Sequence, residues 1–306
     1  MRPKEEPLYE TIRGKLLRIV EDGQELPGIA DPAAMDVLVM QLIDSIRRVI
    51  YVQRLGQRDI SPIRSDPASE HFDPLRAAAM FHQMDMDDEA CWLVFLSTYC
   101  GKHVRYGWKM TRDIYGALGE ADRWTWERTS ANPHAFRAWI GTHHGSIRRS
   151  FGNHRKFESL RPDTRKSPGN VVESYLAWVG DERTHAVRIG EAVYAAEGDR
   201  KTAFEHLFDS MVSVLSFGRT TRFDYLSMLG KLDLAPIEPG SAHLKGSTGP
   251  KSGARLLFGA RRDAALEDRV RMLEARLPLG SFGMQVLEDA LCNWQKSPRR
   301  YVRFRG

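Results

Sequence analysis

Apolar residues recur at intervals of three and four along most of this chain, the spacing that places them on one face of a helix. The clearest stripe follows an Asp31-Pro32 start, in which aspartate caps the helix and proline takes its first position. Its members are Met35, Leu38, Val39, Leu42, Ile43, Ile46, Val49 and Ile50. Other stripes lie within 204–215, 266–277 and 286–294. No convincing alternation of period two occurs, so we predict an all-α fold.

Local signals predict where several helices begin and end. Asp87-Asp88-Glu89 places acids at the positive end of a helix, and the following residues 91–96 are apolar all round, which predicts a buried helix. Gly101 and Gly180 predict helix ends, and Asn132-Pro133 predicts a start. Asn170 with Glu173 three residues later resembles a capping box, and capping alone would explain both residues.

The expected domain organisation follows from composition along the chain. Residues 1–30 are polar with scattered apolar positions, and 56–75 contain three prolines among charges and serines. We therefore expect an N-terminal helical extension over 1–75 and a helical domain over 76–306. Some ten helical patterns joined by turns favour an irregular helical domain over a long bundle.

Bulk composition narrows the classes of function. The chain has 306 residues, a formal net charge of +5 and a pI of about 9.1, which is consistent with a polyanionic partner. No signal peptide and no apolar run of membrane-spanning length is visible, so we expect a soluble, cytoplasmic protein. Its three cysteines and the histidines at 143, 144 and 154 lack metal-ligand spacing, and we predict no metal site.

Three polar stretches carry candidate chemistry, each with a plainer alternative. Residues 142–168 are rich in Arg, Lys and His, typical of a solvated connector or of a phosphate-contacting surface. Gly218 precedes Arg219, Arg222 and Asp224, which would form either a catalytic cluster or a salt-bridge network closing a helix end. The stretch 246–256 suits an ordinary loop that caps a helix or a turn that delivers backbone N–H groups to a phosphate.

Two segments resemble the helix-hairpin-helix DNA glycosylase superfamily. Residues 89–119 are similar to its early helix pair, and Thr248-Gly249-Pro250-Lys251-Ser252-Gly253-Ala254 is similar to its Gly-x-Gly-Pro-Lys-Thr-Ala hairpin, with departures at the first glycine and the penultimate position. The resemblance implies that backbone amides of Gly249, Lys251 and Ser252 grip a DNA phosphate. We add Lys102, Arg299 and Arg300 as DNA-contact candidates; the last two lie in a basic and aromatic tail that equally suits a solvated terminus.

A closer resemblance covers most of the chain. The segments FDPLRAAAMFHQ, FGNHRKFESL, GNVVESYLAWVG, FGRTTRFDYLSMLGKL, IEPGSAHLKGSTGPKSGARLLFG and LEDALCNWQKSP resemble the α-glutamyl/putrescinyl-thymine pyrophosphorylases, clade 3, of bacteriophages and bacteria. This implies a glycosylase-like helical fold and a hypermodification of thymine-like bases in duplex DNA. An amino acid or polyamine would displace pyrophosphate from pyrophosphorylated 5-hydroxymethyluracil, in a phage-infected or bacterial cell.

The residues suit that chemistry. Departing pyrophosphate needs cations, for which Arg219, Arg222, His154, Arg155 and Lys156 are the candidates. The attacking amine must lose a proton, which predicts a carboxylate base. Asp224 is our first choice, followed by Glu173 and Asp289. The target base is expected to flip out of the duplex into a pocket.

Two other functions remain open on sequence alone, a DNA glycosylase acting on a modified or damaged base and a non-catalytic helix-hairpin-helix DNA-binding protein. The sequence also leaves open which amine is transferred, whether Mg²⁺ assists and whether the protein forms oligomers. No other cofactor is indicated.

Overall fold

The computed structural model describes residues 6–120, 122–259 and 265–303. Within these ranges the chain forms α-helices and short 3₁₀ turns, with no β-strand beyond one isolated bridge, which confirms the all-α prediction. None of the helices in the described ranges is long and apolar enough to span a bilayer.

Contacts between residues divide the chain into two compact units. Unit 1 contains the residues up to Tyr51 and those from Glu238 onward, and unit 2 is Val52–Ile237. The N-terminal segment thus shares a unit with the C-terminal segment. This grouping differs from the expected division at residue 75, which stays a prediction about domain organisation.

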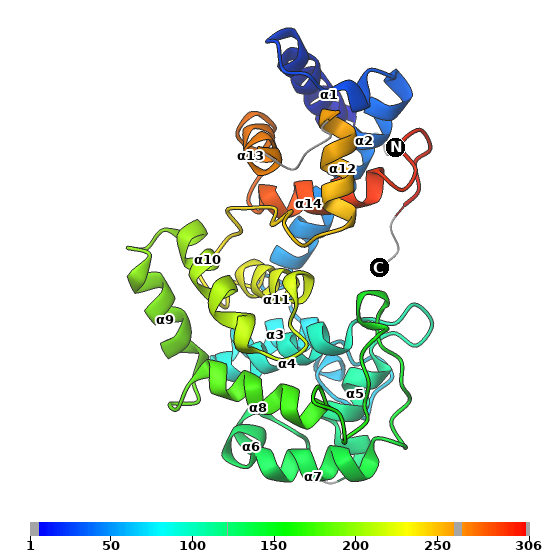
Figure 1. Ribbon diagram of the computed structural model, residues 1–306. Helices are drawn as coiled ribbons and strands as arrows, with labels where there is room; N and C mark the ends of the chain where they lie inside the picture. The colour runs from blue at the N-terminus through cyan, green and yellow to red at the C-terminus, as the bar shows by residue number, and fades with distance from the viewer. Residues whose placement is uncertain (1–5, 121, 260–264, 304–306) are drawn as a thin grey trace. The chain divides into compact units, whose positions relative to one another are not determined.

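Unit 1 is assembled from helices at both ends of the sequence (Figure 1). They are α1 (Glu6–Glu21), η2 (Pro27–Ile29), α2 (Pro32–Gln53, whose last turn crosses the boundary), α12 (Gly249–Phe258), α13 (Leu266–Arg276) and α14 (Gly283–Trp294). The predicted stripe on α2 is buried almost throughout. Trp294 at the end of α14 is fully buried, and its indole N–H donates to the Ala34 carbonyl at 3.0 Å. Apolar burial between α2, α12 and α14 therefore forms the core of this unit.

Unit 2 surrounds the buried helix α4. Its elements are η3 (Pro62–Arg64), α3 (Pro74–Gln83), α4 (Asp87–Cys100), α5 (Lys109–Tyr115), η4 (Ala117–Gly119), α6 (Trp126–Ala131), α7 (Pro133–His143), η5 (Asn153–Arg155), α8 (Pro168–Val179), α9 (His185–Ala195), α10 (Arg200–Ser210), η6 (Met211–Ser213) and α11 (Arg219–Lys231). The helices α3 and α11 pack against α4 (Figure 1). The rings of Phe95, Tyr175 and Phe217 stack there, with centroids 3.8 Å and 5.0 Å from that of Phe95. The prediction that residues 91–96 form a buried helix is confirmed.

Most predicted helix ends are confirmed by cap geometry. The Asn132 side chain accepts from the Ala135 N–H at 3.0 Å, and Gly101 and Gly180 end α4 and α8 with φ of +67° and +108°. The capping box at Asn170 was wrong. Ser167 caps α8 and Pro168 takes its first position, so Asn170 lies inside the first turn.

The segment around Gly218 also differs from the expectation. The stripe within 204–215 ends as a helix at Ser210, and Gly218 is the N-cap of a new helix, α11. Arg219, Arg222 and Asp224 therefore begin a helix and do not follow the end of one. The sequence analysis also missed α1, whose buried residues Ile12, Leu16 and Ile19 recur at helical spacing.

Candidate functional site

The first turn of α11 presents backbone N–H groups at the surface of unit 2. Its N-cap is Gly218, which is exposed and has no side chain to cap the turn. Arg219 is the first helical residue, and its guanidinium lies 4.9 Å from the centroid of the Phe223 ring. Because the first N–H groups of a helix have no partner within it and carry partial positive charge, such a turn favours an anion.

Arg155 fastens this helix start to α4. Its Nε donates to the Tyr99 carbonyl at 3.1 Å, and its Nη1 donates to the Ser216 carbonyl at 2.9 Å and to the Thr221 hydroxyl. The side chain is buried, and burial lowers its pKa against the attraction of Glu158. Most of its donors are thus directed at the protein itself. The expectation that Arg155 contacts pyrophosphate stays a prediction.

Two carboxylates lie around Arg155. One oxygen of Glu158 is 3.5 Å from Arg155 Nη2, and the other accepts from the Ser216 hydroxyl at 2.8 Å. Asp224, on the second turn of α11, also attracts the Arg155 charge and acts to raise the Arg155 pKa. The start of α11, Arg155 and Glu158 therefore lie together, with Asp224 on the next turn of α11; we call these residues the α11 cluster. Sequence analysis selected Asp224 but missed Glu158, whose only sequence signal is its place in the basic stretch.

Arg222 lies on the side of α11 that meets α10. Its Nη1 donates to the Phe208 carbonyl at 2.7 Å, and its guanidinium lies 4.2 Å from the Phe208 ring centroid. Burial lowers its pKa, while Asp209 acts to raise it. These contacts link α11 to α10. Arg222 and Arg219 belong to one sequence motif, but their side chains contact different residues.

The second-choice base Glu173 pairs with α7. Both of its carboxylate oxygens accept from Arg137 Nη1 at 3.0 Å, and one lies 3.8 Å from His134 Nδ1. The remaining candidate, Asp289 in unit 1, accepts from the Ser45 hydroxyl, Arg48 and Asn293 at 2.6–3.0 Å. That carboxylate is saturated with donors and links α14 to α2. The roles of Glu173 and Asp289 as bases stay predictions.

The hairpin-like segment forms the start of α12, whose glycines pack against α14. A Cβ on Gly249 would lie 2.5 Å from Cys292 Sγ, and one on Gly253 would lie 2.3 Å from the Leu291 carbonyl oxygen. Both glycines are thus required by close packing within unit 1. The assignment of Gly249, Lys251 and Ser252 to DNA stays a prediction. The same holds for Arg299, which pairs with Asp31 at 2.8 Å, and for the exposed Arg300.

The three other basic candidates are exposed. Lys102 follows the end of α4, with its Nζ 5.7 Å from the Trp108 ring centroid. His154 and Lys156 flank the buried Arg155 in the loop beside it. No group of three or more His, Cys, Asp or Glu side chains suited to a metal occurs in the described part of the chain.

A buried hydrogen-bond chain crosses unit 2, and sequence analysis missed it. Asp88 accepts from the backbone N–H and the Nδ1 of His185 at 2.7 and 2.6 Å. His185 Nε2 lies 2.6 Å from the Tyr175 hydroxyl, which lies 2.7 Å from the Tyr225 hydroxyl. A carboxylate only accepts, so Nδ1 carries the proton and Nε2 accepts from Tyr175. Tyr225 then donates to Tyr175, and the chain ends on α11, next to Asp224.

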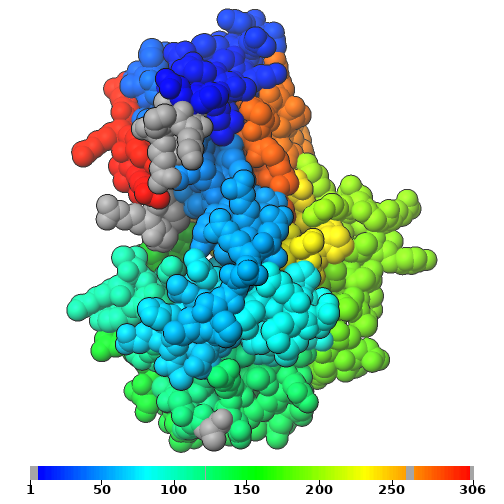
Figure 2. Space-filling model, turned by 180° about the vertical axis from the view of Figure 1, so that it is seen from behind, coloured from blue at the N-terminus to red at the C-terminus, as the bar shows by residue number. Residues whose placement is uncertain are grey.

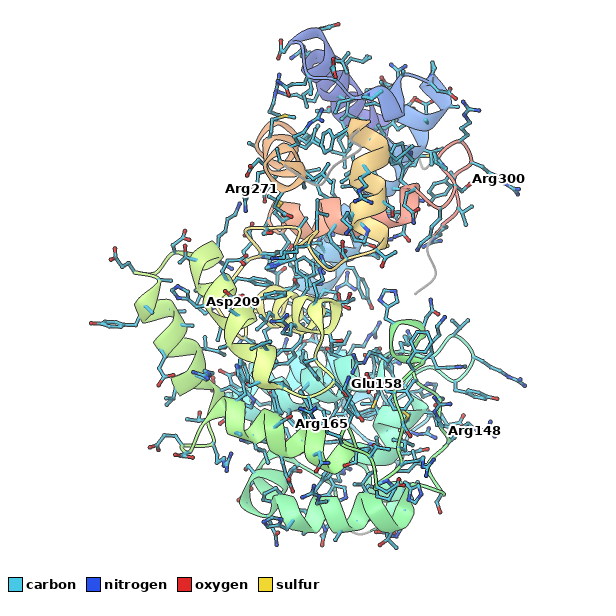
Figure 3. All side chains as sticks on the ribbon, in the orientation of Figure 1. Arg148, Glu158, Arg165, Asp209, Arg271 and Arg300 are labelled. Atoms are coloured by element: carbon cyan, nitrogen blue, oxygen red, sulfur yellow. The ribbon has the colours of Figure 1, made fainter. Side chains whose placement is uncertain are left out.

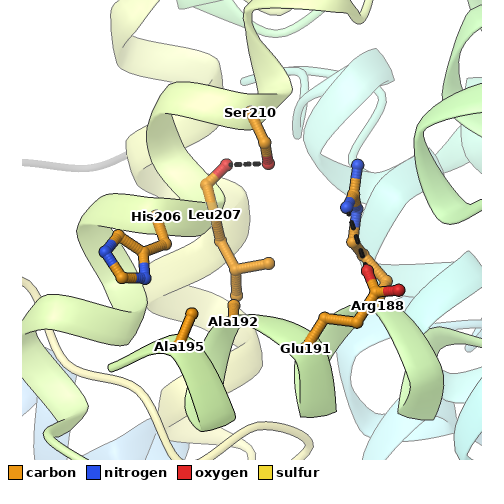
Figure 4. Close-up of a pocket in the computed structure, with 7 residues that line it drawn as sticks. All are labelled: Arg188, Glu191, Ala192, Ala195, His206, Leu207 and Ser210. Carbon is orange, nitrogen blue, oxygen red and sulfur yellow. Dashed lines mark hydrogen bonds and ion pairs between the residues drawn. The ribbon is translucent and has the colours of Figure 1, made fainter. Parts of the chain in front are cut away.

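A pocket of about 320 Å³ lies between α9 and α10, away from the selected residues (Figure 4). Arg188 and Glu191 pair across one side of it at 3.2 Å, and the Ser210 hydroxyl donates to the Leu207 carbonyl at 2.9 Å. None of the predicted site residues lines it.

Comparison with known proteins gives one finding. Residues 33–306 match the model of the family described as alpha-glutamyl/putrescinyl thymine pyrophosphorylase clade 3. Neither a curated protein nor a solved structure gives a significant match. The resemblance to the helix-hairpin-helix glycosylase fold therefore stays a prediction.

Proposed function

The chain belongs to the alpha-glutamyl/putrescinyl thymine pyrophosphorylase clade 3 family, and from this we propose that it is a DNA-modifying transferase. The family description implies an enzyme of thymine hypermodification with a DNA substrate. The finer proposal is that an amino acid or polyamine displaces pyrophosphate from pyrophosphorylated 5-hydroxymethyluracil in duplex DNA. The observation that carries it is the extent of the match, which includes every helix from α2 to α14.

The reaction requires two kinds of group. The amine lone pair forms a C–N bond to the methylene carbon, the C–O bond to pyrophosphate breaks, and pyrophosphate leaves with that electron pair. The ammonium then loses a proton to a base. Cations and fixed N–H dipoles at the leaving group stabilise the developing negative charge, and a carboxylate near the amine accepts the proton.

We propose that the α11 cluster supplies both. The first turn of α11 with Arg219 would hold the departing pyrophosphate, since a helix N-terminus is suited to phosphate. Asp224, one turn further along, would accept the proton of the amine. Glu158 is a second carboxylate close to the same arginine, 3.5 Å from Arg155, and would orient Arg155. Arg222 would anchor α11 through the Phe208 carbonyl, at 2.7 Å.

The test is nucleoside mass spectrometry after incubating the protein with pyrophosphorylated 5-hydroxymethyluracil DNA and a mixture of amines. The expected product is a new adducted nucleoside with release of pyrophosphate. Abasic sites would instead indicate a glycosylase, and unchanged DNA with salt-dependent binding would indicate a non-catalytic DNA-binding protein. DNA containing only 5-hydroxymethyluracil is the substrate control, because it lacks the leaving group.

Variants then test the residue assignment. Arg219→Ala should lower the transfer rate by at least about 100-fold, because a donor to the leaving group is lost. Asp224→Asn should lower it by a similar factor near neutral pH and recover in part at higher pH, where more amine is already deprotonated. Glu182→Gln, on an exposed turn of unit 2, is the matched control and should keep the wild-type rate. Wild-type turnover in both site variants would refute the assignment.

A further inference from the structure

A rigid turn projects from unit 2 immediately after α4. His103 and Gly107 close it with two backbone hydrogen bonds of 3.0 and 2.9 Å. The His103 ring braces it from inside, because its Nδ1 accepts from the backbone N–H groups of Arg105 and Tyr106 at 3.1 Å. Val104 at its tip is 80% exposed. Figure 2 shows the segment coloured for residues just past 100 projecting from one edge of this unit.

The loop 148–158 is fastened beside this turn. Arg148 Nη1 donates to the Tyr106 hydroxyl at 3.1 Å, and its guanidinium lies 4.7 Å from that ring. Arg148 lies at the outer edge of the unit (Figure 3). At its base, the Gly152 N–H donates to the Cys100 carbonyl at 2.8 Å, in a contact too close for a side chain: a Cβ on Gly152 would lie 2.8 Å from the Gly101 carbonyl carbon.

The end of this loop exposes a large aromatic ring. Phe157 is 87% exposed, and Lys156 Nζ lies 5.1 Å from its ring centroid. Arg149 holds the backbone on either side, because its Nη2 donates to the carbonyls of Lys156 and Glu158 at 3.0 and 2.9 Å. The ring is therefore exposed on a braced backbone, close in sequence to the buried Arg155 of the α11 cluster.

Four cations of this turn and loop lack carboxylate partners. Within the described ranges, no ion pair involves Lys102, Arg105, Arg148 or Lys156, whose side chains contact aromatic rings and a tyrosine hydroxyl. Exposed arginines elsewhere in unit 2 do pair, as Arg123 does with Asp66 at 3.0 Å. We call Lys102, Arg105, Tyr106, Arg148, Lys156 and Phe157 the aromatic–basic face. Cations without carboxylate partners and an exposed ring on a braced backbone match the two chemical parts of a nucleic acid, phosphate and base.

We propose that the aromatic–basic face binds the DNA at the target nucleotide, with Phe157 stacking on an unstacked base and the four cations holding the flanking phosphates. The proposal rests on the proposed function for the choice of DNA as the partner. Phe157 would also stabilise the opened duplex. Flipping a base out leaves the neighbouring bases without a stacking partner, and an inserted aromatic ring takes the place of the flipped base. The loop that carries Phe157 also carries Arg155, so the same segment would link DNA binding to the α11 cluster.

The test is fluorescence anisotropy with two duplexes, one fully paired and one carrying an unpaired base at its centre. Phe157→Ala should weaken binding to the unpaired-base duplex by roughly tenfold, the loss expected for one stacked base, with a smaller effect on the paired duplex. Phe157→Trp should restore the affinity. Tyr194→Ala is the matched control, because Tyr194 is another aromatic residue of unit 2 and is 88% exposed; its affinity should equal that of the wild type.

Salt dependence tests the phosphate contacts. Lys156→Ala should lower the slope of log Kd against log salt by roughly one unit, since one phosphate contact is lost. Unchanged affinity in Phe157→Ala or an unchanged slope in Lys156→Ala would overturn the proposal, as would binding to phosphatidylserine vesicles but not to DNA. Amine transfer measured in parallel separates the two hypotheses. Amine transfer by the wild type together with unchanged DNA affinity in Phe157→Ala would refute this face alone, whereas Phe157-dependent binding without any transfer would refute the proposed function alone.

Discussion

Replacing Tyr175 with phenylalanine tests the direction of the buried hydrogen-bond chain in unit 2. The Tyr175 hydroxyl lies 2.6 Å from His185 Nε2 and 2.7 Å from the Tyr225 hydroxyl, and all three side chains are buried. Asp88 fixes the proton on the other ring nitrogen of His185. Tyr175→Phe therefore leaves two buried groups without partners, an acceptor on His185 and a donor on Tyr225.

The magnitude follows from the cost of each unsatisfied group. A buried polar group without a partner costs about 1–3 kcal/mol, so the two groups orphaned in Tyr175→Phe should lower the free energy of unfolding by about 2–6 kcal/mol. Tyr225→Phe removes only the donor to Tyr175, which still donates to His185, and should cost about 1 kcal/mol. The double variant should cost less than the sum, because the orphaned Tyr225 hydroxyl is then absent.

The assay is urea denaturation of the three variants, with hydrogen exchange of α8, α9 and α11 to assign the loss to this unit. Tyr194→Phe is the control, since that side chain is 88% exposed and should change the unfolding free energy by less than about 0.5 kcal/mol. If Tyr225→Phe costs as much as Tyr175→Phe, the assigned direction is wrong. A fully additive double variant would contradict the linked chain.

Three further predictions concern single positions. Burial lowers the pKa of His185 despite its hydrogen bond to Asp88, so this histidine binds a proton more readily in the unfolded state. The free energy of unfolding should therefore fall as the pH drops below 6.5, the ordinary pKa of histidine. His185→Gln should make the free energy of unfolding less dependent on pH between pH 7 and 5. Arg155→Lys should destabilise unit 2 by about 2–4 kcal/mol in urea denaturation, because one ammonium cannot reach all the acceptors of the guanidinium. Gly253→Ala should destabilise unit 1 by about 1–3 kcal/mol, since its Cβ would overlap the Leu291 carbonyl; an unchanged unfolding curve for either of these last two variants would contradict the packing.

The helices that could be predicted are those whose signals are local. The stripe on α2 and the caps at Asn132 and Gly180 need only neighbouring residues, and each is confirmed. The helix α11 was missed because buried polar residues interrupt its apolar pattern. Ser227 is fully buried and Lys231 is 7% exposed, so the positions that face the core do not all appear apolar in sequence.

Only part of the α11 cluster could be predicted, because the contacts of its residues depend on distant parts of the chain. His154, Arg155 and Lys156 are three consecutive basic residues, and the sequence alone gives no means of ranking them. The structure separates them, because Arg155 is buried against the Tyr99 carbonyl, 56 positions earlier in the chain, while its neighbours are exposed. The role of a cation depends on which distant acceptors it meets, and Glu158 was missed for the same reason.

The glycines of α12 illustrate why a motif can fit two physical explanations. Glycine is needed where a backbone approaches a phosphate closely, and equally where it approaches another backbone. The spacing of the glycines therefore does not distinguish phosphate binding from helix packing. Here the neighbours of Gly249 and Gly253 are Cys292 and Leu291 of α14, at 2.5 and 2.3 Å from the places their Cβ atoms would take. Packing thus accounts for the missing side chains without a ligand. The case for DNA at this helix start must therefore rest on its backbone N–H groups and on the charge of Lys251.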